Sequence, residues 1–301
     1  MLSEDLLKSP CDRKTREAYI GGMLMRHGFL SRETIGESRC ARPIDMLCIG
    51  NRDKQVLIAG AFHGMEWITS ALLLKFTDEI CETVKKGGSI FGVRIGTFLN
   101  RRGLALIPCI NPDGVEIQIH GAESAGIYEQ QVLTASGGNT SRWQANAAGV
   151  DINHNFNADW DILHRMEHEN GIVSPSPTRY GGEYPESEPE SRTIASYCRT
   201  GNITHALAFH SQGEEIYWSY GDYAKETAKN MAYAMAGVSG YTVSQPEGLA
   251  VGGGFKDWFV QNFRRPAFTI EVGKGVNPLP ISDLDKIYEQ VKEMMVLSLI
   301  L

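Results

Sequence analysis

The sequence lacks the features that mark several classes of protein. It has only six cysteines in 301 residues, and no two of them have CxxC spacing. Neither a disulfide framework nor a cysteine zinc site is therefore predicted, and we expect reduced thiols in the core. No apolar run reaches the ~18 residues of a membrane span. Basic residues are not in excess, because the formal net charge is −7, which argues against a nucleic-acid partner.

The N-terminus also lacks a recognisable leader. The stretch MLSEDLLKSPCDRKTR carries charges where a signal peptide would have its apolar segment, so we expect a cytoplasmic protein. What is present is enough apolar sequence for a large core, with 42% hydrophobic and 22% charged residues. We find no repeat, low-complexity tract or linker. The sequence therefore predicts one catalytic domain over residues 1–301, with an N-terminal helix and strand, residues 1–50, packed on it.

One stretch, VLIAGAFHGMEWIT at residues 56–69, organises the chain. It begins as a buried strand and continues into a helix whose apolar residues recur four apart from Ile68 to Val84. His63 and Glu66 thus lie at the carboxyl end of a strand, where open α/β sheets bind their ligands. Zinc accepts such a mixture of nitrogen and oxygen ligands. The pattern HxxE alone is more typical of a polar loop, so a metal site requires a third ligand downstream.

Further strands and helices alternate along the chain. This alternation predicts an α/β fold with a largely parallel sheet and helices on both faces. We expect a turn at NPDG (111–114), a long loop over 120–146, mostly irregular chain over 157–186, and a glycine-rich turn at 252–254 before a short helix. We expect strands within 31–49, 103–110, 205–209, 216–218 and 267–272, and helices over 12–27, from a capping box at 187–190 to 198, over 223–237, and over 283–299 with Ser282 as its cap.

Two downstream residues complete the candidate metal site. His210 ends a predicted strand in ALAFHSQG, and Glu271 interrupts the apolar strand TIEVG. An isolated carboxylate in such a strand is costly to bury unless it is paired or functional. His63, Glu66 and His210 make two histidines and a glutamate with a fourth position open, the ligand set of catalytic rather than structural zinc.

With these residues assembled, the sequence resembles the zinc carboxypeptidases of the carboxypeptidase A superfamily. HGMEWIT, NPDG, GVDINHNF, YPESEPES, FHSQG and FTIEVG occur in the family's order over about residues 55–300. The resemblance implies a single α/β domain with a mixed eight-stranded sheet and one zinc ion per chain. It implies that His63, Glu66 and His210 bind the zinc, that Glu271 is the general base, and that Asp151 orients the first histidine.

The sequence departs from the digestive members of that family at the substrate site. Their carboxylate-binding Asn-Arg pair is Asn153-His154 here, and histidine offers no bidentate fork. The usual oxyanion-binding arginine is Gln144, with Arg142 close enough in sequence to replace it. The tyrosine that covers the substrate corresponds to Leu249. Lys256 occupies a position that sets specificity and suits an acidic group on the substrate.

These departures resemble the bacterial branch that cleaves the γ-D-glutamyl–meso-diaminopimelate bond of peptidoglycan peptides. The runs NHNFNADW, SPTRYGG and FHSQGEEIYW point to the same branch. Lys256, Arg179, Glu214 and Glu215 are candidates to bind the extra charged groups of diaminopimelate, although the last three also fit solvated loops. His154, His164 and His168 equally fit loop or surface histidines.

Two other functions fit the same scaffold. One is a deacylase of N-acyl amino acids. The other is a non-catalytic sensor of wall fragments, because Gln144 would weaken oxyanion stabilisation. The complete ligand set together with Glu271 favours catalysis. The sequence indicates nothing about the oligomeric state.

Overall fold

The computed structural model describes residues 8–301, so the predictions for residues 1–7, at the start of the charged N-terminal stretch, lie outside the described residues. The strands are β1 Ser31–Glu37, β2 Pro43–Ile49, β3 Gln55–Ala59, β4 Ser89–Ile90, β5 Val93–Arg94, β6 Gly103–Ile107, β7 Ile203–His210, β8 Glu215–Tyr217, β9 Thr242–Ser244 and β10 Ala267–Glu271. The α-helices are α2 Arg13–Arg26, α3 Ile68–Lys85, α4 Ile95–Arg101, α5 Pro112–His120, α6 Glu129–Ser136, α7 Trp160–Glu169, α8 Pro189–Thr200, α9 Glu226–Ser239, α10 Phe255–Phe263 and α11 Leu284–Ser298.

Eight strands form one mixed sheet in the order β1-β2-β6-β3-β7-β10-β8-β9. The central strands β6, β3, β7 and β10 run parallel, whereas β2 pairs antiparallel with β1 and β6, and β8 pairs antiparallel with β10. The central strands are apolar on both faces, as buried parallel strands require. The predicted α/β fold with an eight-stranded mixed sheet is confirmed.

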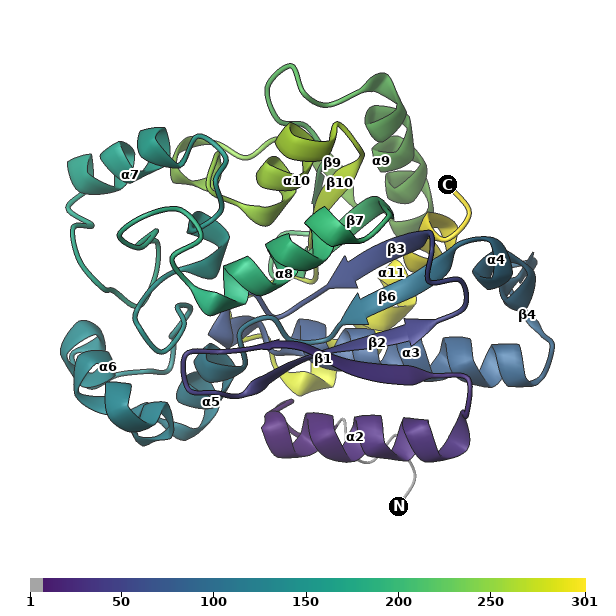
Figure 1. Cartoon of the computed structure of the whole chain (residues 1–301), viewed down its shortest axis with the longest axis horizontal. Helices are drawn as coiled ribbons and strands as arrows, with labels where there is room; N and C mark the ends of the chain where they lie inside the picture. The colour runs from purple at the N-terminus through teal and green to yellow at the C-terminus, as the bar shows by residue number, and fades with distance from the viewer. Residues whose placement is uncertain (1–7) are drawn as a thin grey trace.

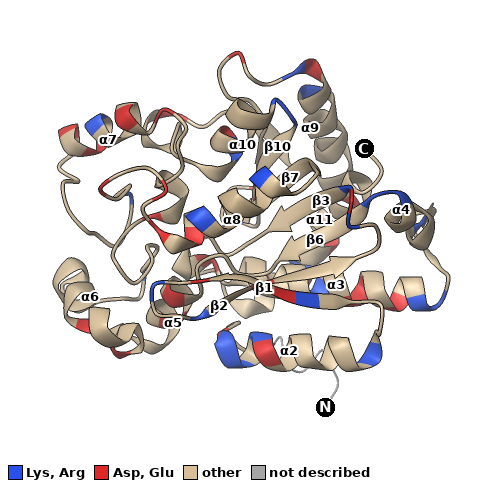
Figure 2. Cartoon of the chain, in the orientation of Figure 1, with Lys and Arg blue, Asp and Glu red and all other residues tan. Residues whose placement is uncertain are grey.

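Helices cover both faces of this sheet. Along β3, Val56 and Ile58 pack on one side against α2, α3, α9 and α11, while Leu57 and Ala59 face the side covered by α8 and α10. Figure 1 shows α2 and α3 along one edge of the view and α8 and α10 on the opposite side of the strands. Charged residues lie mainly on the helices and loops, and the central strands carry almost none (Figure 2). Among the described residues, no helix is long and apolar enough to span a membrane.

The N-terminal segment belongs to the sheet rather than lying on it. Residues 31–49 form the antiparallel pair β1–β2, and β2 bonds to β6 near the sheet centre. Helix α2 begins after Asp12, whose carboxylate accepts a hydrogen bond from Thr15 N.

All six cysteines are free, and five of them are buried, as expected for reduced core thiols.

The chain between β6 and α8 is more helical than predicted. The NPDG segment is not a turn but the start of α5, because Asn111 caps the helix by accepting from Gly114 N and Pro112 occupies its first turn. The predicted loop over 120–146 contains α6 and a preceding 3₁₀ segment, Ala122–Tyr128, around a small core that includes Trp143. The predicted irregular stretch 157–186 contains α7, which buries Trp160, Leu163 and Glu167.

Two predicted helix caps are also wrong. The first residue before α8 is Glu188 rather than Ser187, and the Glu190 carboxylate accepts from Arg39 N and Asn146 Nδ2 instead of closing a capping box. A 3₁₀ turn, Ile281–Asp283, precedes α11, so Ser282 does not cap that helix. At the start of α8, contacts of the Glu190 carboxylate with residues distant in sequence replace the capping box. At the start of α11, a 3₁₀ turn replaces the capped first turn.

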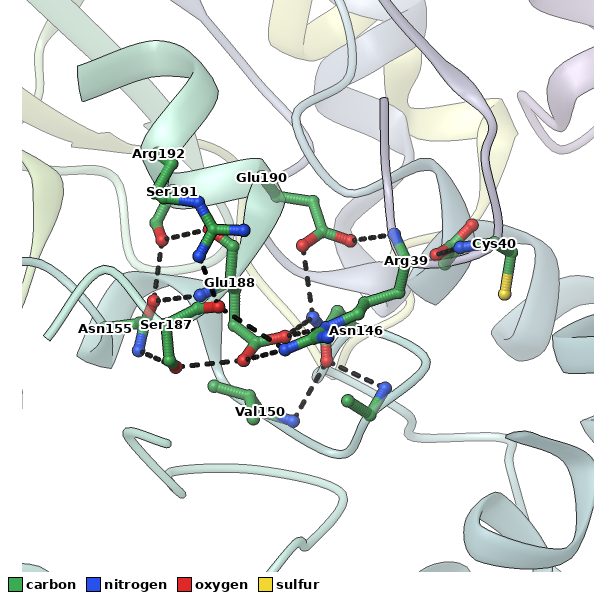
Figure 3. A network of polar contacts seen from close by, with 12 residues as sticks. Arg39, Cys40, Asn146, Val150, Asn155, Ser187, Glu188, Glu190, Ser191 and Arg192 are labelled. Atoms are coloured by element: carbon green, nitrogen blue, oxygen red, sulfur yellow. Dashed lines mark hydrogen bonds and ion pairs between the residues drawn. The ribbon is translucent and has the colours of Figure 1, made fainter. Parts of the chain in front are cut away.

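A buried polar network holds the loops beyond the carboxyl ends of the central strands (Figure 3). Asn146 Nδ2 donates to Glu188 and Glu190, and its Oδ1 accepts from Ala148 N and Val150 N. Arg39, from the turn between β1 and β2, donates two hydrogen bonds to Glu188. The loop that leads to Asp151 is therefore tied both to the edge of the sheet and to the start of α8.

Candidate active site

Three of the predicted residues come from the carboxyl ends of neighbouring parallel strands. His63 follows β3 by four residues, His210 is the last residue of β7, and Glu271 is the last residue of β10. Strands β7 and β10 pair so that His210 and Glu271 are directly opposed. The register of two parallel strands thus places a candidate ligand and the candidate base side by side, at the edge where open α/β sheets bind ligands.

His63, Glu66 and His210 form a buried cluster. His63 Nδ1 lies 2.9 Å from Glu66 Oε1, and His210 Nδ1 lies 3.1 Å from Glu66 Oε2 and 3.3 Å from His63 Nδ1. Glu66 reaches the cluster from the 3₁₀ turn Gly64–Glu66 that precedes α3. Potential ligand atoms of the three residues all lie within 4.8 Å of one another.

The geometry of the cluster fits a zinc ion. Ligand atoms at ~2.1 Å from a tetrahedral zinc lie about 3.3–3.4 Å apart, which matches the separation of the two Nδ1 atoms. His63 Nε2 lies 3.1 Å from the Asp151 carboxylate, which only accepts hydrogen bonds when ionised, so the proton of a neutral His63 ring is on Nε2 and the lone pair of Nδ1 faces the cluster. Two converging imidazole nitrogens and a carboxylate are the donor set of catalytic zinc sites.

The charges around His63 favour binding of a cation at the cluster. Although burial acts in the opposite direction, the charge of His63 keeps the pKa values of Asp151 and Glu66 low. Against the effect of burial, Glu66 and Asp151 raise the pKa of His63 well above its usual value. Glu66 in the cluster and Asp151 beside it are therefore two carboxylates that attract a cation, and a metal ion can take the place of the proton.

Glu271 faces the same space with a different environment. It lines the cleft beside His63 and His210, and no hydrogen bond to its carboxylate is formed by the described residues. Burial, followed by repulsion from Glu66, raises the pKa of Glu271 well above the usual range of a carboxyl group. A carboxylate of raised pKa next to a metal site is suited to accept and return a proton.

A cleft of about 690 Å³ opens over the cluster. All six residues predicted to bind substrate line it, namely Arg142, Gln144, Asn153, His154, Arg179 and Lys256. Leu249 lines it as well, from the 3₁₀ turn Gly248–Ala250. A second hollow of about 480 Å³ shares His63, Gln144 and Glu271 with this cleft, so space extends to both sides of the candidate base.

Lys256 lines the cleft, but its charge is already paired. The side chain is only 5% exposed, its Nζ donates to Ser219 O at 2.6 Å, and it forms an ion pair with Asp257. Glu214 and Glu215 are not among the residues that line the cleft. Glu214 pairs with Lys274, and Glu215 accepts from Tyr217 and Ser244. Because these partners already satisfy the carboxylates, the two acids do not provide a site for a charged substrate group.

Three residues that line the cleft form hydrogen bonds with other residues of the protein. Gln144 Oε1 accepts from Thr178 Oγ1 at 2.6 Å, and Asn153 Oδ1 accepts from Phe255 N at 3.0 Å. His154 Nδ1 lies 2.8 Å from Glu167 Oε1. These contacts orient the two amides, whose NH₂ groups form no hydrogen bond with the described residues, and they leave Nε2 as the one ring nitrogen of His154 without a partner there. His164 also contacts Glu167, from α7 rather than from a loop, whereas His168 is exposed as expected.

Glu167 and Thr178 were missed by the sequence analysis. The spacing of Trp160, Leu163 and Glu167 on one face of α7 could have placed this carboxylate on the buried side of a helix. Thr178 gives no comparable signal, because its contact with Gln144 joins two loops.

A second group of possible ligands, His27, Asp78 and Glu82, lies between α2 and α3. The carboxylate of Asp78 already accepts hydrogen bonds from Arg26 and Tyr19. The group of His27, Asp78 and Glu82 therefore already has a permanent cation, Arg26, bonded to it.

Comparison with known proteins gives a consistent result. A family model described as zinc carboxypeptidase matches residues 17–294. The chain is 36% identical over 264 residues to gamma-D-glutamyl-L-diamino acid endopeptidase 1 of Lysinibacillus sphaericus, covering 87% of this chain and 65% of the relative. It is 33% identical over 264 residues to the uncharacterized protein YqgT of Bacillus subtilis (strain 168), covering 86% and 69%. The chain thus spans about two thirds of the length of these relatives.

Solved structures share the fold at lower identity. Thrombin activatable fibrinolysis inhibitor superimposes with a TM-score of 0.77 at 20% identity, covering 97% of this chain and 74% of the other. Murein-tripeptide amidase MpaA from Escherichia coli O157 gives a TM-score of 0.53 at 18% identity, covering 89% and 90%.

Proposed function

This chain belongs to the zinc carboxypeptidase family, and from that premise we propose that it is a zinc metallopeptidase of peptidoglycan peptides, hydrolysing the γ-D-glutamyl–meso-diaminopimelate bond. The observation that carries the proposal is the cluster of His63, Glu66 and His210 at the strand ends, with Glu271 in register beside His210. A cluster of this kind without an adjacent base would suit binding alone, whereas the pair suits hydrolysis.

In the proposed mechanism His63, Glu66 and His210 would hold one zinc ion, and Asp151 keeps His63 in the tautomer that leaves Nδ1 free. When bound, zinc would act as a Lewis acid and lower the pKa of the attacking water to about 7. Glu271 accepts a proton from the attacking water and returns it to the leaving amine.

The oxyanion has two candidate donors in this chain. The NH₂ group of Gln144 is available because Thr178 bonds the amide oxygen, and Arg142 lines the cleft beside it. Either donor can stabilise negative charge that develops on the scissile carbonyl oxygen. The hydrogen bond from Thr178 holds Gln144 in place, whereas Arg142 is exposed.

Two observations support the proposed substrate class, the name of a relative and the groups on the cleft wall. The relative of 36% identity is named for cleavage between γ-D-glutamyl and L-diamino acid residues. The wall around Asn153, His154 and Arg179 offers N–H groups, which suits the carboxylates of such a peptide. The paired state of Lys256 gives that residue a supporting rather than a direct role in recognition.

The proposal is tested by incubating the zinc-loaded protein with L-Ala-γ-D-Glu-meso-diaminopimelate and identifying the products by mass spectrometry. We expect release of diaminopimelate, and slow release of basic or aromatic C-terminal residues from ordinary peptides. Fast release of those residues without cleavage of the γ-glutamyl peptide would contradict the substrate assignment. Zinc binding without turnover of any γ-glutamyl or N-acyl substrate would favour a wall-fragment sensor instead.

A further inference from the structure

Two histidines lie one turn apart on α7, at the edge of the molecule (Figure 1). His164 and His168 have the spacing i, i+4, which makes side chains neighbours on a helix surface. Their Nε2 atoms are 3.1 Å apart, and their ring centroids are 4.5 Å apart. His168 is exposed and the side chain of His164 is 23% exposed, so a dissolved ion can reach both rings.

His164 is held in one orientation by the protein. Its ring stacks on Trp160, with the centroids 4.3 Å apart and the planes within 14° of parallel. Trp160 is fixed in turn, because its Nε1 donates to Gly181 O at 3.0 Å. His164 Nδ1 lies 3.3 Å from Oε2 of Glu167, a fully buried carboxylate. Together these contacts keep His164 Nε2 directed at His168.

The Glu167 carboxylate also selects the tautomer of His164. An ionised carboxylate only accepts hydrogen bonds, so a neutral His164 carries its proton on Nδ1 and its lone pair on Nε2. Carboxylates behind metal-binding histidines fix the ring in the same way. Without a metal ion, His168 Nε2 donates its proton to that lone pair. Solvent can bond either nitrogen of the exposed His168 ring, so this proton can move to Nδ1 and leave two facing lone pairs.

The separation of the two nitrogens fits one bound metal ion. Nitrogens at about 2.1 Å from an ion lie about 3.0 Å apart at a right angle and about 3.4 Å apart at the tetrahedral angle. The observed 3.1 Å lies between these values. Imidazole suits Cu²⁺, Ni²⁺ and Zn²⁺, whereas Ca²⁺ and Mg²⁺ take oxygen ligands. Helix α7 carries the acids Asp161, Glu167 and Glu169 against one arginine, so its charge favours a cation.

We propose that His164 and His168 form a second metal site, which binds one divalent transition-metal ion that prefers nitrogen ligands and leaves its other coordination positions to water. The site shares no ligand with the proposed zinc site of His63, Glu66 and His210 and goes beyond the proposed function. With two protein ligands instead of three, it should exchange its ion more readily than the site at the strand ends.

The test adds nickel to protein whose strand-end site is already filled. After the protein is loaded with one equivalent of zinc and freed of excess metal, calorimetry at about pH 8 measures Ni²⁺ binding to neutral histidines. Metal analysis of the same samples counts nickel and zinc. We expect one Ni²⁺ per chain in addition to the zinc. His164→Gln and His168→Gln should each raise the dissociation constant of Ni²⁺ by at least about 10-fold, since even losing an outer partner of a ligand costs that much.

Two controls separate chelation from the mere presence of histidine. His120→Gln removes an exposed histidine from α5 and should leave the dissociation constant within about 2-fold of wild type, because the sites are independent. The double variant Arg165→His/His168→Gln keeps two histidines on α7 but makes them adjacent, where helix side chains do not face each other. It should bind Ni²⁺ as weakly as His168→Gln.

Equal Ni²⁺ affinity in wild type and His164→Gln, or wild-type affinity in the double variant, would overturn the inference. Uptake of nickel only in exchange for zinc would overturn it as well. If wild type retains no zinc, the proposed function fails separately. Nickel binding that His164→Gln weakens and His210→Ala does not would still support the site on α7.

Discussion

Glu271 is the residue on which the choice between enzyme and binding protein depends. It ends β10 opposite His210, faces the cleft and has a raised pKa because of burial and the nearby Glu66. In this position a carboxylate can serve both proton transfers of a hydrolysis. The arrangement favours catalysis over the sensor, because a binding protein has no need of an unpaired, half-buried acid beside the candidate metal site.

We expect Glu271→Gln to keep zinc and substrate binding while losing activity. Glutamine preserves the shape of the side chain but cannot ionise, so kcat should fall by at least ~10²–10⁴-fold. Steady-state kinetics on the γ-glutamyl peptide, with metal analysis of the same samples, measures both effects.

Glu215 provides a matched control for that variant. It lies on β8 directly opposite Glu271 but is bonded to Tyr217 and Ser244. Glu215→Gln should retain kcat within about 10-fold of wild type. A Glu271→Gln protein that works at nearly the wild-type rate would mean that another residue is the base.

At the scale of elements, the site depends on loops that a buried polar network holds. Glu188 and Glu190, at the start of α8, meet Asn146 and Arg39 in the interior (Figure 3). Burial, followed by repulsion from Asp113 and Glu188, raises the pKa of Glu190 to about 8. For Glu188 burial acts in the same direction, but Arg39 and Asn146 prevail and lower the pKa.

These opposite shifts predict an unusual pH dependence of stability. Between the unfolded pKa of about 4.3 and the folded pKa of about 8, native Glu190 holds a proton that the unfolded chain has lost. Its contribution to the free energy of unfolding therefore falls as pH rises through this window, by up to about 1.4 kcal/mol per unit, and is constant above it. Glu190→Gln should remove this slope, so urea denaturation should show the variant gaining on wild type between pH 6 and pH 8.5.

Glu188→Gln is the control with the opposite sign. Because the folded pKa of Glu188 is lowered, its contribution to stability is present above the unfolded pKa and is lost as pH falls through the folded pKa. Glu188→Gln should therefore destabilise the protein at neutral pH, with no relief at pH 8.5. Parallel pH profiles for wild type and Glu190→Gln would show that Glu190 is already ionised in the folded protein.

At the scale of the whole molecule, the proposed metal site joins segments that are distant in the sequence. His63 and Glu66 come from the segment between β3 and α3, and His210 comes from β7, the strand next to β3 in the sheet. A ligand that binds only the folded chain stabilises it, by about 2.7 kcal/mol at one hundred times the dissociation constant. Metal occupancy and thermal stability should therefore change together.

We expect chelation to remove activity and lower the melting temperature, and added zinc to restore both. His210→Ala should contain much less zinc than wild type, and its melting temperature should not respond to the chelator. His205→Gln provides the comparison, since His205 lies on the same strand but bonds Ser298 O instead of the cluster. Equal zinc content in wild type and His210→Ala would contradict the ligand assignment.

The sequence by itself determined the central strands, the strand-end residues and the family. The strands β3, β6, β7 and β10 can be recognised in the sequence, because parallel strands buried on both faces need nearly continuous apolar sequence. Strand ends then located His63, His210 and Glu271, since parallel strands deliver their carboxyl ends to one edge. The roles of these residues, and the extent of the domain, stay predictions until the variants are measured.

Only the tertiary structure decided which polar groups are available to a substrate. Local patterns could not reveal that Lys256 bonds Ser219 O, that Glu190 bonds across to Arg39, or that α7 places Glu167 behind His154. Such contacts join segments whose separation in sequence carries no periodic signal. A hydrogen bond or ion pair depends on distances of about 3 Å between side chains, and those distances are set by the packing of the whole fold.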